Sequence, residues 1–283
     1  MTRRIALADS LLTVAVWGAM VLLTGVFCWM LADIVWHGIG KLDWEFLTTE
    51  PMDAGRAGGI LPILVSTLLI LLVALGVAVP LGLGAAIYLS EFTRSQSRFR
   101  RFVNISLDAL SGVPSIVFGL FGNAFFCIWL GLGFSILSGG LTLACMVLPI
   151  FIRLSESGLS AVAVEWRQGA SALGLSRSAT LWHLLLPAAA PAISAGLMLG
   201  IGRALAETAA LIFTSGYVDR MPEALGDSGR ALSVHIYDLS MNVSGGDQAA
   251  YASALVLMVA LLLINGASTT LSRHFLQNRI QLS

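Results

Sequence analysis

The sequence predicts an all-α, polytopic membrane protein with six transmembrane helices, and three observations support this fold class. The 283-residue chain is 57% hydrophobic and only 11% charged, whereas a soluble domain is about a quarter charged. Six apolar stretches are long enough to cross about 30 Å of hydrocarbon, which takes about 20 helical residues. The cationic residues gather in alternate connections between these stretches, as expected of a chain that crosses a membrane repeatedly.

Each expected span is a largely uninterrupted apolar run, because a helix satisfies its own backbone polar groups within lipid. The six spans cover residues 11–36, 60–89, 102–130, 134–152, 188–216 and 250–271. Two arginines precede the first span, but its apolar run is too long for a secretory signal peptide and no small-residue cleavage site follows. We therefore expect the first span to be retained as a helix.

The basic residues predict the orientation of the chain. Of the 16 arginine and lysine residues, eleven lie in the N-terminal segment, the second and fourth connections and the C-terminal tail. Four lie in the other connections, and Arg203 is inside a span. The positive-inside rule then places both termini in the cytoplasm. The formal net charge is zero, so no nucleic-acid partner is expected.

Several kinds of chemistry are excluded by the residue pattern. The single lysine, Lys41, lacks the glycine spacing and the following Ser or Thr of a P-loop, so the chain is not itself an ATPase of that type. The three cysteines show no metal-ligand or redox spacing, and the four histidines are scattered. We expect no catalytic residue, no metal and no cofactor in this chain.

The fifth span holds the charges on which the functional hypothesis rests. Arg203 lies about 24 Å along a helix from Pro187, near the bilayer midplane, where a charge costs roughly 2.5 to 3.5 kcal/mol on insertion scales. Glu207 follows at i+4, so an intrahelical ion pair is one interpretation. The other makes Arg203 a five-donor fork for an oxyanion, with Glu207 orienting it. The two interpretations are compatible.

The third span combines Pro114 with three glycines, which is typical of a kink or of an unwound turn that lines a cavity. Both possibilities stay open at this point. In a cavity-lining break, the hydroxyls of Ser111 and Ser115 could solvate an anion. Neither serine has a histidine or lysine partner within a span, so an intramembrane enzyme is the weaker alternative.

The connection at residues 165–187 is expected to form two short helices. Helix-forming residues stop at Gly174, a C-terminal cap, and resume at Ser176 or Ser178 as the next N-cap. Such an element lies on the membrane face, where it can dock in a groove of a partner.

The same connection resembles the cytoplasmic coupling motif of binding-protein-dependent ABC importer permeases. The spacing from the glycine to the Leu-Pro pair is the same, while the usual Glu-Ala-Ala opening reads Gln-Gly-Ala and the usual isoleucine is a leucine. The resemblance implies that seven positions couple the chain to an ATPase. They are Gln168, Gly169, Ala170, Gly174, Leu184, Leu186 and Pro187.

Further segments resemble the phosphate-importer branch of this family, in its second (PstA-like) permease subunit. They are Gly59–Leu68 leading to Ala86–Phe92, Ser111–Gly122, Arg203–Ala210 and, outside the membrane, Leu232–Leu239. The similarity covers about residues 59–271. In that branch, an arginine and a glutamate of the fifth span are associated with phosphate passage, which implies this role for Arg203 and Glu207 and includes Thr208 in the pathway. Ala206 and Ala210 replace a usual glycine and proline.

The resemblance implies a type I ABC importer permease fold in a multi-pass subunit of a bacterial inner membrane. Residues 1–58 are expected to form an N-terminal helix and an outer loop, residues 59–273 the transmembrane domain, and residues 274–283 a cytoplasmic tail. The implied function is the inward movement of inorganic phosphate by alternating access.

Partners are implied in the same way. They are a homologous permease that completes a heterodimer, a dimer of ATP-binding subunits that hold ATP and Mg, a periplasmic phosphate-binding protein, and membrane lipid. Because an arginine fork suits any tetrahedral oxyanion, phosphonate and phosphite stay open as alternative substrates.

Overall fold

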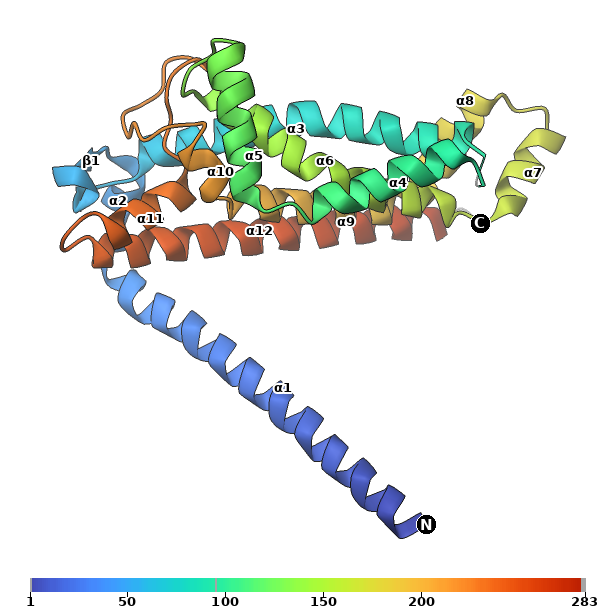
Figure 1. Ribbon diagram of the computed structural model, residues 1–283, viewed down its shortest axis with the longest axis horizontal. Coiled ribbons are helices and arrows are strands. Elements are labelled where there is room, and N and C mark those ends of the chain that lie inside the picture. The colour runs from blue at the N-terminus through green and yellow to red at the C-terminus, as the bar shows by residue number, and fades with distance from the viewer. Residues whose placement is uncertain (1, 95, 281–283) are drawn as a thin grey trace.

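The computed structural model describes residues 2–94 and 96–280, with side chains described from 12 to 266. Long helices run side by side along the longest axis of the molecule, and α1 diverges from them (Figure 1). Helix α3 packs against α6, α6 against α9, and α9 against α12. The short helices α7 and α8 lie at one end, which we call the coupling end, and α2, β1 and α11 lie at the other, the outer end.

The helices are α1 (Thr2–Gly38), α2 (Trp44–Thr48), α3 (Leu61–Ile87), α4 (Arg98–Ser111), α5 (Ser115–Gly122), α6 (Ile136–Ser160), α7 (Val164–Ala172), α8 (Arg177–Thr180), α9 (Leu186–Leu205), α10 (Ala209–Ile212), α11 (Leu232–Met241) and α12 (Asp247–Ile280). The 3₁₀ turns are η1 (Ile39–Lys41) and η2 (Asp53–Gly55), and the π-helical turns are η3 (Tyr88–Phe92), η4 (Asn123–Trp129) and η5 (Leu181–Leu185). The strands β1 (Pro51–Met52) and β2 (Ala57–Gly58) pair antiparallel, with Pro51 opposite Gly58.

The number of membrane-spanning helices agrees with the sequence prediction. Five described segments are long and apolar enough to cross a membrane, and the number is six when a bent pair of helices is counted as one span. The five are residues 12–41, 61–92, 136–160, 177–205 and 247–266. The all-α class is confirmed, since the two strands contain two residues each.

The bent pair is formed by the third apolar stretch, for which the sequence left a kink or an unwound turn open. Helices α4 and α5 are bent by 98° where they meet. Helix α4 ends at Ser111, and Pro114 has extended backbone (φ −58°, ψ 139°) before α5 begins. The break arises because proline lacks an N–H and its ring disfavours helical backbone in the residue before it.

Two glycines of α9 lie where the helix approaches α6 too closely for a larger side chain. A Cβ atom added at Gly200 would lie 2.7 Å from Val147, and one at Gly196 would lie 3.0 Å from Leu154. Both contacts are between α9 and α6, as the Gly-x-x-x-Gly spacing predicts. Buried leucine, isoleucine and phenylalanine side chains from α3 and α6, with Phe151 among the least exposed, fill the space around this contact.

The fifth span differs from its prediction. We expected a helix from Ala188 to Gly216, but the continuous helix runs from Arg177 to Leu205 and stops there. The backbone restarts as α10 at Ala209. No proline or glycine marks this break. Instead, the Glu207 carbonyl accepts a hydrogen bond from the Ser233 hydroxyl of α11, a contact between segments distant in the sequence.

Candidate functional site

Arg203 lies in the last turn of α9, within a membrane-spanning helix. Its side chain is half-buried. No hydrogen bond or ion pair joins its guanidinium to any of the described side chains, those of residues 12–94 and 96–266. A guanidinium carries five donors and a permanent charge. The five donors of Arg203 are therefore unpaired among the side chains described.

Glu207 is engaged differently. It is only 8% exposed, and its Oε1 accepts a hydrogen bond of 3.1 Å from the backbone N–H of Ala210. The carboxylate thereby satisfies a donor at the start of α10, as a helix cap does. The intrahelical ion pair that the i+4 spacing predicts is absent from the described residues, because the helix ends between Arg203 and Glu207.

Thr208 follows within the break, as the residue that precedes α10. Its side chain makes no capping hydrogen bond and is partly exposed. The break therefore presents a free cation, a buried carboxylate and a hydroxyl within six consecutive residues. Charged groups next to interrupted helices are typical of ion and substrate sites in transporters.

The predicted serines lie on the neighbouring broken helix. Helix α5 packs tightly on α10, since a Cβ atom added at Gly119 would lie 2.8 Å from the Cα atom of Ala210. Ser115 is the first residue of α5. The Ser111 hydroxyl donates to the Leu107 carbonyl at 2.8 Å, inside its own helix. The two helix breaks thus share an interface, but among the described side chains no hydrogen bond joins either serine to Arg203.

The coupling element has the predicted form of two short helices. Helix α7 ends before Gly174, which has a φ of +71°, a value that favours glycine. The Ser176 hydroxyl then caps α8 by accepting from the Ala179 N–H at 3.2 Å. Of the seven predicted coupling residues, Gln168, Gly169, Ala170 and Gly174 lie on α7 and its turn, with Ala170 alone buried. Leu184, Leu186 and Pro187 lie where η5 continues into α9.

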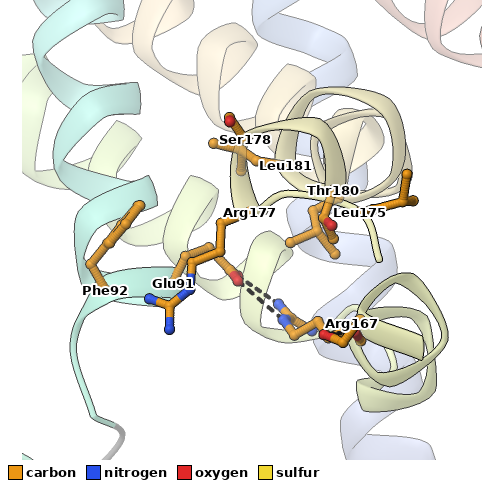
Figure 2. A pocket seen from close by; sticks show the side chains of 10 residues that line it. Glu91, Phe92, Arg167, Leu175, Arg177, Ser178, Thr180 and Leu181 are labelled. Carbon is orange, nitrogen blue, oxygen red and sulfur yellow. Dashed lines mark hydrogen bonds and ion pairs between the residues drawn. The ribbon is translucent and has the colours of Figure 1, made fainter. Parts of the chain in front are cut away.

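An ion pair that the sequence did not reveal ties this element to the bundle. Arg167 of α7 pairs with Glu91 of η3 through two contacts, Nη2 to Oε1 at 2.7 Å and Nε to Oε2 at 3.2 Å, which Figure 2 shows as dashed lines. Arg167 also donates to the carbonyls of Val162 and Leu159, at 2.7 and 2.9 Å. Bidentate pairing fixes the geometry as well as the distance. The two residues are 76 positions apart, so no local pattern indicates the pair.

A cavity of about 440 Å³ lies beside this ion pair, between η3, α7 and α8. Its lining comprises Glu91, Phe92, Arg167, Ser171, Leu175, Arg177, Ser178, Thr180, Leu181 and Leu185. Figure 2 shows charged groups at one side of this hollow and apolar side chains elsewhere around it. The cavity therefore separates part of the coupling element from η3, at the end of the span 61–92.

A second charged cluster holds the outer end together. Arg230 is 9% exposed and contacts Asp238 at 3.2 Å, Asp219 at 3.7 Å and the Tyr217 carbonyl at 2.8 Å. It also lies 3.4 Å from Nδ1 of His235. His235 is fully buried; burial and the charge of Arg230 lower its pKa to about 4. Arg230 thus fixes the outer loop onto α11.

Comparison with known proteins gives consistent matches. Residues 78–279 match the model of a family described as binding-protein-dependent transport system inner membrane component. Probable ABC transporter permease protein YqgI of Bacillus subtilis is 29% identical over 262 residues, which is 87% of each chain. Phosphate transport system permease protein PstA of Mycobacterium leprae is 33% identical over 246 residues, 84% of this chain and 79% of that protein.

A solved structure supports the same fold. The structure of a bacterial ABC transporter involved in the import of the acidic polysaccharide alginate superimposes with a TM-score of 0.62 at 16% identity. The superposition covers 95% of this chain and 99% of that chain. The arrangement of the six spans is therefore that of ABC importer permeases.

Proposed function

We propose that this chain, which belongs to the family of binding-protein-dependent transport system inner membrane components, carries inorganic phosphate across the membrane as the PstA-like permease subunit of an ATP-driven importer. Several relatives at 30% identity or more are phosphate transport system permeases. The chain is then a transport subunit, and ATP and Mg bind to separate ATPase subunits.

One observation carries the proposal of an anionic substrate. The guanidinium of Arg203 lies in a membrane-spanning helix, beside a helix break, with no hydrogen-bond or ion-pair partner in the described part of the chain. Because an unpaired charge in this position is energetically unfavourable, a mobile counter-ion explains its presence. A planar fork of donors suits the oxygens of a phosphate group.

The remaining geometry supports a coupled carrier. A permanent open path past a fixed cation would leak anions, whereas alternating access exposes the site to one side at a time. Attachment through Arg167 and Glu91 lets a movement of α7 reach η3, and through η3 the helix α3 that it continues. In this proposal a homologous permease completes the pathway, a dimer of ATP-binding subunits moves the coupling elements, and a periplasmic phosphate-binding protein delivers the substrate.

The test is uptake of radiolabelled phosphate by cells that lack other phosphate importers and express the partner subunits with this chain. Arg203→Gln is expected to lower uptake at least about tenfold, and Arg203→Lys is expected to restore only part of it, because lysine lacks the planar fork. Arg220→Gln, which removes an exposed cation from the outer loop, is the matched control. All variants are compared at equal abundance in the membrane.

Either of two outcomes contradicts part of the proposal. Undiminished uptake with Arg203→Gln removes Arg203 from the pathway. Absence of phosphate uptake by the intact chain, combined with uptake of phosphonate or phosphite, assigns another tetrahedral oxyanion to the same site. Arsenate and phosphonate competitors are included in each assay for this reason.

A further inference from the structure

A strip of arginine and aromatic side chains at the coupling end has no part in the function described above. It extends from η3 into the first turns of α4 and consists of Tyr88, Phe92, Arg94, Arg98, Phe99, Arg101 and Phe102. We propose that this arginine–aromatic strip binds the headgroup of an anionic glycerophospholipid. The inference is independent of which anion the importer transports.

The charge of the strip is uncompensated. Arg94, Arg98 and Arg101 are exposed, and their guanidinium groups have no hydrogen-bond or ion-pair partner among the side chains described, those of residues 12–94 and 96–266. Arg100, in the same turn, points the other way and pairs with Glu156, with Nε 3.0 Å from Oε1. The strip therefore presents three exposed cations, of which Arg98 and Arg101 share one face of α4 at i,i+3 spacing.

Nearby carboxylates do not neutralise these cations, because other arginines hold them. Glu91 is bound by Arg167, and Asp108 by Arg153, whose Nε lies 3.1 Å from Oδ1. An external anion is the complementary partner for the strip. Clusters of arginine next to a membrane span attract anionic lipids in this way.

Aromatic residues neighbour the three cations along the sequence. Tyr88 stacks on Phe92 with ring centroids 6.4 Å apart, and it meets Phe99 edge-on at the same distance. All three rings are more than half exposed. Tyrosine and other amphipathic aromatic side chains favour the depth of the headgroups at a membrane interface. The strip begins at the end of the span 61–92, which places it at that depth.

The order of side chains along α4 matches the order of groups in a phospholipid. One face of α4 packs on α6 through Arg100 and the buried Leu107. The exposed face carries Arg98 and Arg101 first, and then Phe102 and Ile105, which are 69% and 58% exposed. Cations followed by apolar groups suit a phosphate followed by acyl chains. A free phosphate ion would leave the apolar part of this face uncovered, so the geometry favours a lipid.

The experiment measures lipid binding to the assembled importer, purified with its partner subunits, by native mass spectrometry. The probes are phosphatidylglycerol and phosphatidylcholine of identical acyl chains. We expect about tenfold tighter binding of phosphatidylglycerol, weakened by salt because the contact is electrostatic. The triple variant Arg94→Gln, Arg98→Gln, Arg101→Gln is expected to lose this preference, and the corresponding triple lysine variant to keep most of it.

Controls distinguish the alternatives. Arg220→Gln removes one exposed cation at the outer end and is expected to leave the preference intact. Equal binding of the two lipids by the intact importer overturns the proposal, as does a preference that persists in the triple glutamine variant. Displacement of phosphatidylglycerol by inorganic phosphate would instead assign a free-anion site. Loss of ATPase subunits from the triple glutamine variant, but not from the lysine variant, would assign a protein interface.

Discussion

Arg203 and Glu207 are both charged residues of the fifth expected span, but the structure gives their side chains different hydrogen-bond partners. The guanidinium of Arg203 has no partner among the residues described, whereas the carboxylate of Glu207 accepts from the Ala210 N–H. In the proposed function, Arg203 is therefore the group that binds the substrate. Glu207 is the group that holds the restart of the helix in place.

Substitution of Glu207 tests this division. Glu207→Ala removes an acceptor from a buried backbone N–H and is expected to lower the free energy of unfolding by about 1 to 2 kcal/mol. Glu207→Gln keeps an oxygen at the same position, so it is expected to unfold near the temperature of the unaltered protein. Thermal unfolding of the purified importer measures both. Equal destabilisation by Gln and Ala would show that the charge, and not the hydrogen-bond acceptor, holds this segment.

His235 makes the outer end sensitive to acid. Burial first, and the Arg230 charge second, lower its pKa to about 4, with Asp238 acting in the opposite direction. An unfolded chain protonates this histidine near pH 6.5, so the unfolded state binds more protons between about pH 6.5 and 4. Stability from this residue is therefore complete above that window and falls as the pH falls through it.

The expected loss is about 2 kcal/mol at about pH 5 relative to about pH 7.5. His235→Asn keeps an oxygen that can accept from Arg230 but cannot titrate in this range. Unfolding temperatures of both proteins at the two pH values give the measurement. If the asparagine variant loses as much stability on acidification as the unaltered protein, the carboxylates and not His235 cause the effect.

At the scale of elements, the sequence predicted a helix break where a local residue such as proline causes it. It did not predict a break that depends on a contact with a distant helix. The break between α4 and α5 was predictable, because Pro114 determines it locally. The end of α9 at Leu205 was not, because Ala206 and Glu207 are compatible with a helix and the break includes a contact from Ser233. That contact belongs to a different helix, α11. The residues of the fifth span alone therefore give no indication of the contact with Ser233.

The coupling element shows the same contrast. Its two helices and the turn at Gly174 follow from capping residues that the sequence displays. Its attachment to η3, which continues α3, depends on Arg167 and Glu91, which only the fold brings together. The position of the element relative to the bundle was therefore not predictable from its local pattern.

We expect this attachment to transmit force. Glu91→Gln removes the ion pair and is expected to lower the amount of phosphate transported per ATP hydrolysed several-fold, because α7 can then move without α3. Exchange of the two charges, Glu91→Arg with Arg167→Glu, should restore part of the coupling. Vesicles that contain the complete importer provide both rates. Unchanged coupling in Glu91→Gln would restrict the ion pair to a role in stability.

At the scale of the whole molecule, much of helix α1 has no packing partner among the side chains described. Helix α1 packs on α12 near its end, where the Tyr251 hydroxyl donates to Asp33 at 3.1 Å. Earlier along α1, the side chains of residues 12–30 are exposed on all sides, and the helix diverges from the bundle (Figure 1). Because most of these side chains are apolar, we expect them to contact lipid or a second subunit in a membrane. The sequence predicted this span, but its direction depends on packing.

The orientation of the molecule gives the final prediction. The basic residues of the second and fourth connections lie at the coupling end, which the positive-inside rule assigns to the cytoplasm. We replace the three cysteines, Cys28, Cys127 and Cys145, and introduce Met52→Cys at the outer end or Gln96→Cys at the coupling end, both at exposed positions. A thiol reagent that cannot cross membranes should label position 52 in intact spheroplasts and position 96 only after permeabilisation. The reverse pattern would place the coupling element outside the cell, where no ATP-binding subunit could reach it.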